Sequence, residues 1–174
     1  RGSGGCLSSR RKNAAARKIF DYAIFSTARR IISIDSDIVF FRRADELLDP
    51  DDHVSRFNRD MAYAYSLPQE DLNRLSGCDV PPLINSGLFA VDRASIDLKQ
   101  VDMWLEDERL FADEWVTEQT LHAMLAARSG VALLDARYKV SAEQGILEGL
   151  ICKHYPGFYR RHLYLEGYAQ ARVT

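Results

Sequence analysis

The stretch "RRIISIDSDIVFFRR", residues 29–43, places Asp35 and Asp37 inside an apolar run. The residues around them are mostly β-branched or aromatic, and a continuous run of this kind predicts a strand covered on both faces. Carboxylates are costly to bury unless a partner compensates their charge. The stretch therefore predicts a buried strand with two aspartates at its end, where something pairs with them.

The length and composition are those of one ordinary globular domain. The 174 residues are enough to bury a real core, and 47% of them are hydrophobic and 28% charged. The net charge of -2 at pH 7 gives no general attraction to nucleic acid or to an acidic membrane surface. We therefore expect no nucleic-acid partner, and local recognition of any polyanionic ligand.

Cysteine usage and the absence of long apolar runs suggest a cytoplasmic setting. Cys6, Cys78 and Cys152 form no CxxC pair, which favours free thiols in a reducing compartment. No run approaches the roughly 18 apolar residues of a transmembrane helix. Residues 1–12, which begin "RGSGG", are expected to be a linker or a cut end, and residues 13–174 a single domain.

Apolar periodicity predicts alternating helices and strands along the chain. We expect helices over residues 14–29, 96–108 and 113–128, and strands over residues 61–68, 83–92, 131–140 and 151–159. A short helical turn after the aspartates should end at Pro50. This alternation predicts an α/β fold with a mixed sheet flanked by helices.

Asp35 and Asp37 are the first candidates for chemistry. At the carboxyl edge of a sheet, where open α/β folds bind ligands, they could hold a divalent cation that neutralises a diphosphate. The alternative is a solvated strand end or a cap for the helical turn that follows. Farther on, Asn85, Ser86 and Gly87 would let polar groups approach a sugar hydroxyl, although a β-bulge would also explain a glycine in a strand.

Two later segments supply further candidates. Glu118 and Gln119 lie on the helix predicted for residues 113–128, where acidic side chains also complement the helix dipole without any ligand. In "CKHYPGFYRR", the imidazole of His154 suits a transition metal, and Arg160 and Arg161 suit phosphate oxygens.

In this order the motifs resemble those of metal-dependent nucleotide-sugar glycosyltransferases of the GT-A fold, most closely family 8 and its relatives. "IISIDSDIVFF" is similar to the DxD motif at a strand end, and "NSGLFAVD" to the strand that follows it. A helix containing "EQ" comes next. "LLDARYKV" and "KHYPG", similar to the LPxxYN and HxxG segments, complete a likeness over about residues 15–160.

The resemblance implies a hexosyltransferase that moves a sugar from a nucleotide-diphosphate sugar, with UDP favoured, to a carbohydrate, lipid or protein acceptor. Asp35, Asp37 and His154 would bind Mn²⁺ or Mg²⁺ at the donor diphosphate, and Asp35 would also approach the ribose. The residues implied around the substrate are Asn85, Ser86, Gly87, Arg160 and Arg161, with Glu118 and Gln119 in the catalytic position.

The sequence also departs from the family pattern. The "KPW" after the HxxG motif is missing, and "EQT" stands where family 8 commonly has "DQD". Only 34 residues precede Asp35, which is fewer than GT-A enzymes generally place before the DxD. The resemblance therefore implies an N-terminally truncated GT-A-like domain: either a fragment that begins after the nucleotide-binding part or a shortened relative with weakened binding. We expect a partner chain, a missing segment or low stability.

Two other functions fit parts of the sequence. "DSDIV" matches the DxDx[TV] motif of haloacid-dehalogenase-type phosphohydrolases, in which Asp35 would be the nucleophile and Asp37 the acid or base. That family also needs a pair of acidic residues for Mg²⁺ farther along the chain, and the only candidates in this sequence are Asp135 and Glu143. The third alternative is a non-catalytic remnant of the glycosyltransferase fold.

Overall fold

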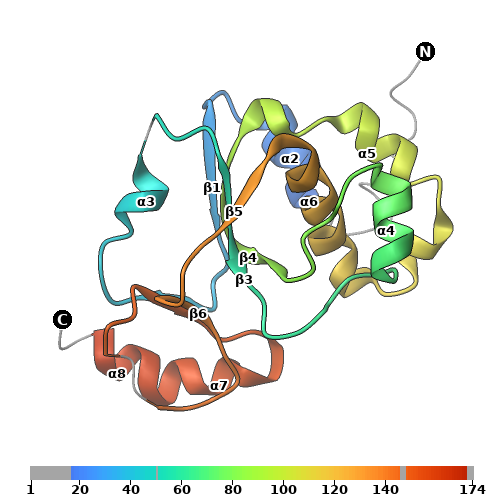
Figure 1. Ribbon diagram of the computed structural model, residues 1–174. Coiled ribbons are helices and arrows are strands. Elements are labelled where there is room, and N and C mark those ends of the chain that lie inside the picture. The colour runs from blue at the N-terminus through green and yellow to red at the C-terminus, as the bar shows by residue number, and fades with distance from the viewer. Residues whose placement is uncertain (1–16, 50, 146–147, 172–174) are drawn as a thin grey trace.

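The computed structural model describes residues 17–49, 51–145 and 148–171. The expected linker at residues 1–12 and Cys6 lie outside these residues. Two β-sheets stand at the centre, with most of the helices on one side of the first sheet and the C-terminal helices beside the second (Figure 1). The α/β class with mixed sheets and flanking helices is thereby confirmed.

The first sheet has four strands in the order β1-β4-β3-β5. Their bounds are β1 Arg30–Ile34, β4 Ile84–Asp92, β3 Ser55–Arg59 and β5 Val131–Leu133. β4 pairs antiparallel with both β1 and β3, whereas β3 and β5 are parallel. Since β4 is central, eight of its nine residues are buried, and the "NSG" triplet lies in the middle layer of the molecule.

The second sheet has three strands in the order β2-β7-β6. Their bounds are β2 Ile38–Phe40, β7 Cys152–His154 and β6 Tyr138–Val140. β7 pairs antiparallel with β2 and parallel with β6. The chain passes from the first sheet to the second through Asp35 and Asp37, which connect β1 to β2.

Helices cover the first sheet on one face. They are α2 Arg17–Phe25, α4 Gln69–Ser76, α5 Leu98–Trp104 and α6 Glu114–Ser129, with single 3₁₀ turns at Arg93–Ser95 and Glu108–Phe111. Phe57 and Phe89 stack with ring centroids 5.2 Å apart, and the His122 ring of α6 lies 4.5 Å from that of Phe89. His122 is thus a packed core residue, and α6 is fixed against the centre of the sheet.

The opposite face of the first sheet packs on the second sheet and on α3, Asp45–Leu48. Leu88 and Ala90 of β4 share this smaller core with Leu47, Tyr138 and Cys152. The chain ends in a helical run that comprises a 3₁₀ turn at Gly157–Tyr159, α7 Arg160–His162, the π-helix η4 Leu163–Gly167 and α8 Tyr168–Ala171. This run lies beside the second sheet (Figure 1).

The predicted strand does end at the aspartates, as β1, but it is not covered on both faces, and the apolar run after Asp37 belongs to another sheet. The run is divided at the aspartates into β1 and β2, which belong to different sheets. β1 is also an edge strand of its sheet, and its exposed face carries Ile32 and Ile34 at 37% and 53% exposure. The apolar residues after Asp37 are explained by the second sheet rather than by continuation of the first.

Other element predictions are corrected as well. Residues 61–68 form a loop rather than a strand, because Tyr63 and Tyr65 donate their hydroxyls to the carbonyls of Leu67 and Pro81. The strand lies earlier, at β3. Residues 131–140 supply two short strands instead of one, the helix predicted for 96–108 is shorter, and α4 and the C-terminal helices were not predicted.

The helix predicted for residues 113–128 is confirmed as α6. Asp113 caps it by accepting the Trp115 amide, and Gly130 ends it with a φ of 86°. Within the described parts of the chain, no helix is both long enough and apolar enough to span a membrane.

Candidate metal centre

The turn between the two sheets is held by backbone hydrogen bonds on both sides. The Asp35 amide donates to the Gly87 carbonyl of β4 at 2.8 Å, and the Tyr155 amide donates to the Asp37 carbonyl at 2.9 Å. The turn is closed by the Ile38 amide, which donates to the Asp35 carbonyl at 3.2 Å. Both aspartates are therefore positioned by the junction of the sheets.

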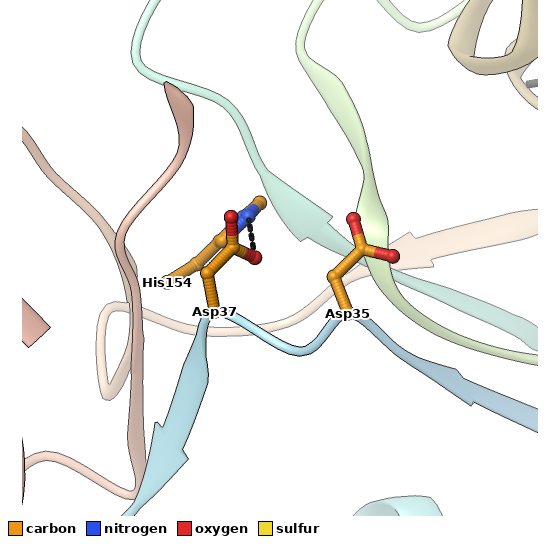
Figure 2. A group of neighbouring side chains, drawn as sticks. All are labelled: Asp35, Asp37 and His154. Atoms are coloured by element: carbon orange, nitrogen blue, oxygen red, sulfur yellow. Dashed lines mark ion pairs between the residues drawn. The ribbon is translucent and has the colours of Figure 1, made fainter. Parts of the chain in front are cut away.

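Asp35, Asp37 and His154 come together at this junction. Each offers one ligand atom, and these atoms all lie within 4.8 Å of one another. The two carboxylates rise on the same side of the turn, and the His154 ring lies beside Asp37 (Figure 2). Asp37 and His154 are buried, whereas a third of the Asp35 side chain is exposed. The cluster is thus buried on the Asp37 side and open at Asp35.

Gly87 makes room for the His154 ring. A Cβ atom at Gly87 would lie 2.4 Å from Cε1 and 2.8 Å from Nδ1 of His154, well inside contact distance. The chain also has a bulge here, because the register between β3 and β4 shifts between Phe57 and Asn58, opposite the "NSG" triplet. The β-bulge expected for this triplet is therefore present, and Gly87 also makes room for a side chain of the cluster.

Asn85 fixes the orientation of the His154 imidazole. Its Oδ1 lies 3.0 Å from His154 Nδ1 and also accepts the Gly87 amide at 3.0 Å, while its Nδ2 donates to Asp60 at 3.0 Å. A flipped amide would place its NH₂ against the Gly87 N–H and its oxygen against the Asp60 carboxylate, so the orientation is determined. Because Oδ1 can only accept, His154 carries its proton on Nδ1.

The other imidazole nitrogen then faces a carboxylate oxygen. His154 Nε2 lies 3.1 Å from Asp37 Oδ1. In the neutral tautomer that Asn85 selects, this is an acceptor opposite an acceptor, and Asp37 Oδ1 has no hydrogen-bond donor among the described residues. Only a cation can satisfy both atoms: a second proton on the ring or a metal ion between them.

Arg160 holds the second oxygen of Asp37. Its Nε donates to Asp37 Oδ2 at 2.7 Å, although the Arg160 side chain is 65% exposed. Burial raises the pKa of the Asp37 carboxyl, but the His154 ring and the Arg160 guanidinium outweigh that effect and lower it to about 2. Asp37 is therefore ionised in the folded protein.

Lys18 of α2 is a site residue that the sequence analysis missed. Its Nζ lies 2.5 Å from Asp35 Oδ1 and 3.6 Å from Glu118 Oε1. Burial lowers the pKa of the Lys18 ammonium, but attraction by Glu118 and Asp35 outweighs it and raises the pKa. The signal available in the sequence was a basic residue among the apolar positions of the predicted helix, which alone is too common to identify a site.

Glu118 is buried beside the cluster and has only long contacts to Lys18 and His122 at Oε1. Its side chain is 7% exposed, and Oε1 lies 3.5 Å from His122 Nε2 but has no hydrogen-bond donor within the described chain. Gln119 differs, because it accepts the Ser86 amide at 3.1 Å and donates to Asp60 and to the Ala64 carbonyl. Glu118 therefore has a free acceptor near the cluster, whereas Gln119 fastens α6 to β4.

The remaining predicted residues lie apart from the cluster. Arg161 donates from Nε to His162 Nε2 at 3.2 Å and does not contact the aspartates. Of the two predicted arginines, only Arg160 binds one of them. The two acids considered for a phosphohydrolase pair locally, Asp135 with Arg137 at 2.7 Å and Glu143 with Lys139 at 3.6 Å. Neither acid joins Asp35 and Asp37.

The donor set fits a divalent cation. Two carboxylates and one imidazole suit Mn²⁺, and the carboxylates suit Mg²⁺ as well. The orphaned Asp37 oxygen and the preset His154 tautomer are what a metal ligand requires, since ligating histidines almost always donate their other N–H to a protein acceptor.

Comparisons with known proteins add nothing to these observations: no protein-family model, no curated protein and no solved structure matches the chain.

Proposed function

We propose that this chain is a metal-dependent glycosyltransferase of GT-A type that transfers a sugar from a nucleotide-diphosphate sugar, with UDP favoured. Asp35, Asp37 and His154 would hold Mn²⁺ or Mg²⁺. When bound, the cation would act as a Lewis acid on the leaving diphosphate. The proposal rests on the resemblance of the motifs and on the site's geometry.

One observation supports the metal most directly: the contact of 3.1 Å between His154 Nε2 and Asp37 Oδ1. Asn85 keeps the proton of His154 on Nδ1, so both facing atoms are acceptors. Such a contact is unfavourable in a buried site unless the ring carries a second proton or a cation is bound by both atoms. We propose the bound cation, because Asp35 adds a third ligand atom beside these two.

The basic residues of the site support an anionic substrate. Lys18 and Arg160 each bind one carboxylate of the aspartate pair, and both are partly exposed. They therefore place positive charge at the mouth of the candidate metal site, where a diphosphate would bind. Arg160 would thus take the place of the lysine in the family's "KPW" segment, which this sequence does not contain.

Glu118 supports transfer of a sugar rather than simple phosphate binding. Its Oε1 is a buried acceptor that has no hydrogen-bond donor among the described residues and lies 3.6 Å from Lys18 Nζ. A carboxylate in this state can accept hydrogen bonds from sugar hydroxyls or stabilise positive charge that develops at the anomeric carbon. Gln119 would contribute by holding α6 and Ser86 in place.

Calorimetric titration tests this function. We expect pyrophosphate and UDP to bind in the presence of Mn²⁺. Both should bind at least about 100-fold more weakly after chelation or in Asp37→Asn, a larger loss than is typical when a residue that only supports a metal ligand is changed. Pyrophosphate tests the metal and the neighbouring basic side chains, Lys18 and Arg160, without a contribution from the nucleoside. Hydrolysis of UDP-glucose would then report turnover.

Asp135→Asn is the matched control, because it removes an exposed carboxylate that pairs with Arg137 outside the cluster. It should leave both affinities unchanged. Absence of metal-dependent binding in the folded wild-type protein would overturn the proposal, and trapping of an aspartyl beryllofluoride at Asp35 would favour the phosphohydrolase. Binding without turnover of any nucleotide sugar would favour the non-catalytic alternative.

A further inference from the structure

Lys18 lies between two carboxylates and satisfies only one of them. Its Nζ donates to Asp35 Oδ1 at 2.5 Å, whereas Glu118 Oε1 lies 3.6 Å from the same ammonium. The Glu118 side chain is 7% exposed, and its Oε1 has no hydrogen-bond donor among the described residues. A buried polar atom without a partner is costly, and more so when it is charged. Glu118 therefore needs a donor, and the Lys18 ammonium beside it is held by another acid.

Asp35, the acid that holds Lys18, is also the candidate metal ligand on the open side of the cluster. A divalent cation bound by Asp35 would face the Lys18 ammonium across the same carboxylate. Like charges at so short a distance repel each other, and they do so more strongly at a partly buried site than in water. Lys18 and a metal ion would therefore compete for Asp35.

Glu118 offers Lys18 a second position. The 3.6 Å between Nζ and Oε1 is only slightly longer than a hydrogen bond. A lysine side chain is flexible, and that of Lys18 is 33% exposed, so it can rotate without disturbing the core. Glu118 is fixed by comparison, because it is buried on α6 and the next residue, Gln119, accepts the Ser86 amide of β4. A small rotation of Lys18 would thus exchange Asp35 for Glu118.

We infer that Lys18 is a positioning residue that holds Asp35 in the metal-free protein and moves to Glu118 when a divalent cation binds. This inference rests on the proposed function, because it requires a cation at Asp35, Asp37 and His154. The exchange keeps each charge paired: Asp35 replaces the ammonium by the cation, and Glu118 gains the donor that it lacks. The other lone pairs of the Glu118 carboxylate stay free to accept from a sugar hydroxyl.

Calorimetric titration with Mn²⁺ in a double-mutant cycle tests the exchange without turnover. Lys18→Met removes the competing ammonium and should raise Mn²⁺ affinity by about tenfold. Glu118→Gln weakens the second position and should lower the affinity by about tenfold in the wild-type background, but by no more than about twofold beside Lys18→Met. Equal losses in the two backgrounds would mean that Lys18 acts only as a fixed charge, and the inference would be overturned.

Lys99→Met is the matched control for the loss of a positive charge. It removes the same ammonium from an exposed residue of α5, a helix that supplies no residue of the cluster. The affinity for Mn²⁺ should stay within about twofold of wild type, as expected for separate sites.

Nuclear magnetic resonance follows the movement in the wild-type protein, with diamagnetic Mg²⁺ in place of Mn²⁺. Nuclear Overhauser contacts from the Lys18 Hε protons to the Asp35 Hβ protons should weaken as Mg²⁺ saturates the protein. Those to the Glu118 Hγ protons should strengthen. Contacts that stay unchanged at saturation would overturn the exchange, even if a variant of the cycle failed to fold.

These outcomes separate the exchange from the proposed function. If wild type binds Mn²⁺ and pyrophosphate but Glu118→Gln loses the same affinity with and without Lys18, the exchange is wrong and the metal site stands. Absence of Mn²⁺ binding in both wild type and Lys18→Met would overturn the proposed function, and the exchange with it.

Discussion

Lys153 and His154 are neighbours on β7, yet their surroundings are opposites. Lys153 points to the C-terminal helical run, where Nζ donates to Glu166 and to the Glu143 carbonyl, while the Gly145 amide donates to the other Glu166 oxygen. His154 points the other way, where its Nδ1 faces Asn85 of β4 and its Nε2 faces an oxygen of Asp37 that has no hydrogen-bond donor among the described residues. The charge and hydrogen bonds of Lys153 are satisfied within the protein, whereas the contact between His154 and Asp37 needs an added cation.

The two neighbouring residues should therefore serve different purposes: Lys153 stabilises the fold, and His154 would bind the metal. A buried ion pair with satisfied hydrogen bonds resists removal of either partner, because the remaining charge is stranded. The Asp37 carboxylate pairs with Arg160, whose side chain is 65% exposed, and an ion pair of this kind stabilises little, so loss of the charge at Asp37 should cost function more than folding. The proposed Asp37→Asn variant should therefore stay folded while it loses metal-dependent binding.

The largest effect on stability is expected for Glu166→Gln. It leaves the Lys153 ammonium, 3% exposed, without its counter-charge and should lower the free energy of unfolding by about 3 kcal/mol. Urea denaturation monitored by circular dichroism measures the change. Affinity for Mn²⁺ should change by less than about twofold in the folded protein, within the scatter of separate sites.

Glu143→Gln is the matched control for that prediction. The Glu143 carboxylate is 80% exposed and pairs only loosely with Lys139, while its backbone carbonyl would still accept from Lys153. The change in unfolding free energy should stay below about 0.5 kcal/mol. Equal losses in the two variants would show that Lys153 and Glu166 do not form the stabilising contact described here.

A smaller effect, on function, is expected for Asn85→Ala. Once the acceptor at Nδ1 is removed, one tautomer of His154 is no longer favoured. Loss of a hydrogen-bond partner of a metal-binding histidine typically costs about 10- to 100-fold in metal affinity, so we expect about tenfold for Mn²⁺. Titration gives the affinity, and the ¹⁵N chemical shifts of the His154 ring report the tautomer. An unchanged affinity together with an unchanged tautomer would show that Asn85 does not orient the ring.

The residues of the candidate site were predicted from the sequence more accurately than the strands around them. Asp35, Asp37 and His154 were grouped through the resemblance of the motifs to a known family, and the folded chain brings them together. The division of residues 31–41 between two sheets could not be predicted, since it depends on pairing of β2 with β7, more than 100 residues farther along the chain.

Gly87 and Lys18 are two residues whose roles could not be predicted from the sequence. A glycine in a strand predicts a bulge, but the need for it lies in the His154 ring, which only the folded chain brings within 2.4 Å of a Cβ at that position. Lys18 lies on a helix that precedes both aspartates, and its contact with Glu118 of α6 depends on how two helices pack on one sheet. Such tertiary contacts leave no local pattern.

The smallest expected effect is the pH dependence of the Lys153–Glu166 pair. Burial raises the pKa of Glu166, but the hydrogen bonds from Lys153 and the Gly145 amide outweigh it and hold the pKa below its ordinary value. A lowered pKa means that the pair contributes fully above the unfolded-state pKa of about 4.3 and loses its contribution as pH falls through the folded-state pKa.

The measurement is the difference in unfolding free energy between wild type and Glu166→Gln at a series of pH values. Because glutamine does not titrate and the other carboxylates are common to both proteins, the difference isolates Glu166. It should be constant between about pH 5 and 7 and should shrink below that range. A difference that persists at full size in acid would mean that Glu166 stabilises the helical run by its shape, through contacts such as that of Gly145, rather than by its charge.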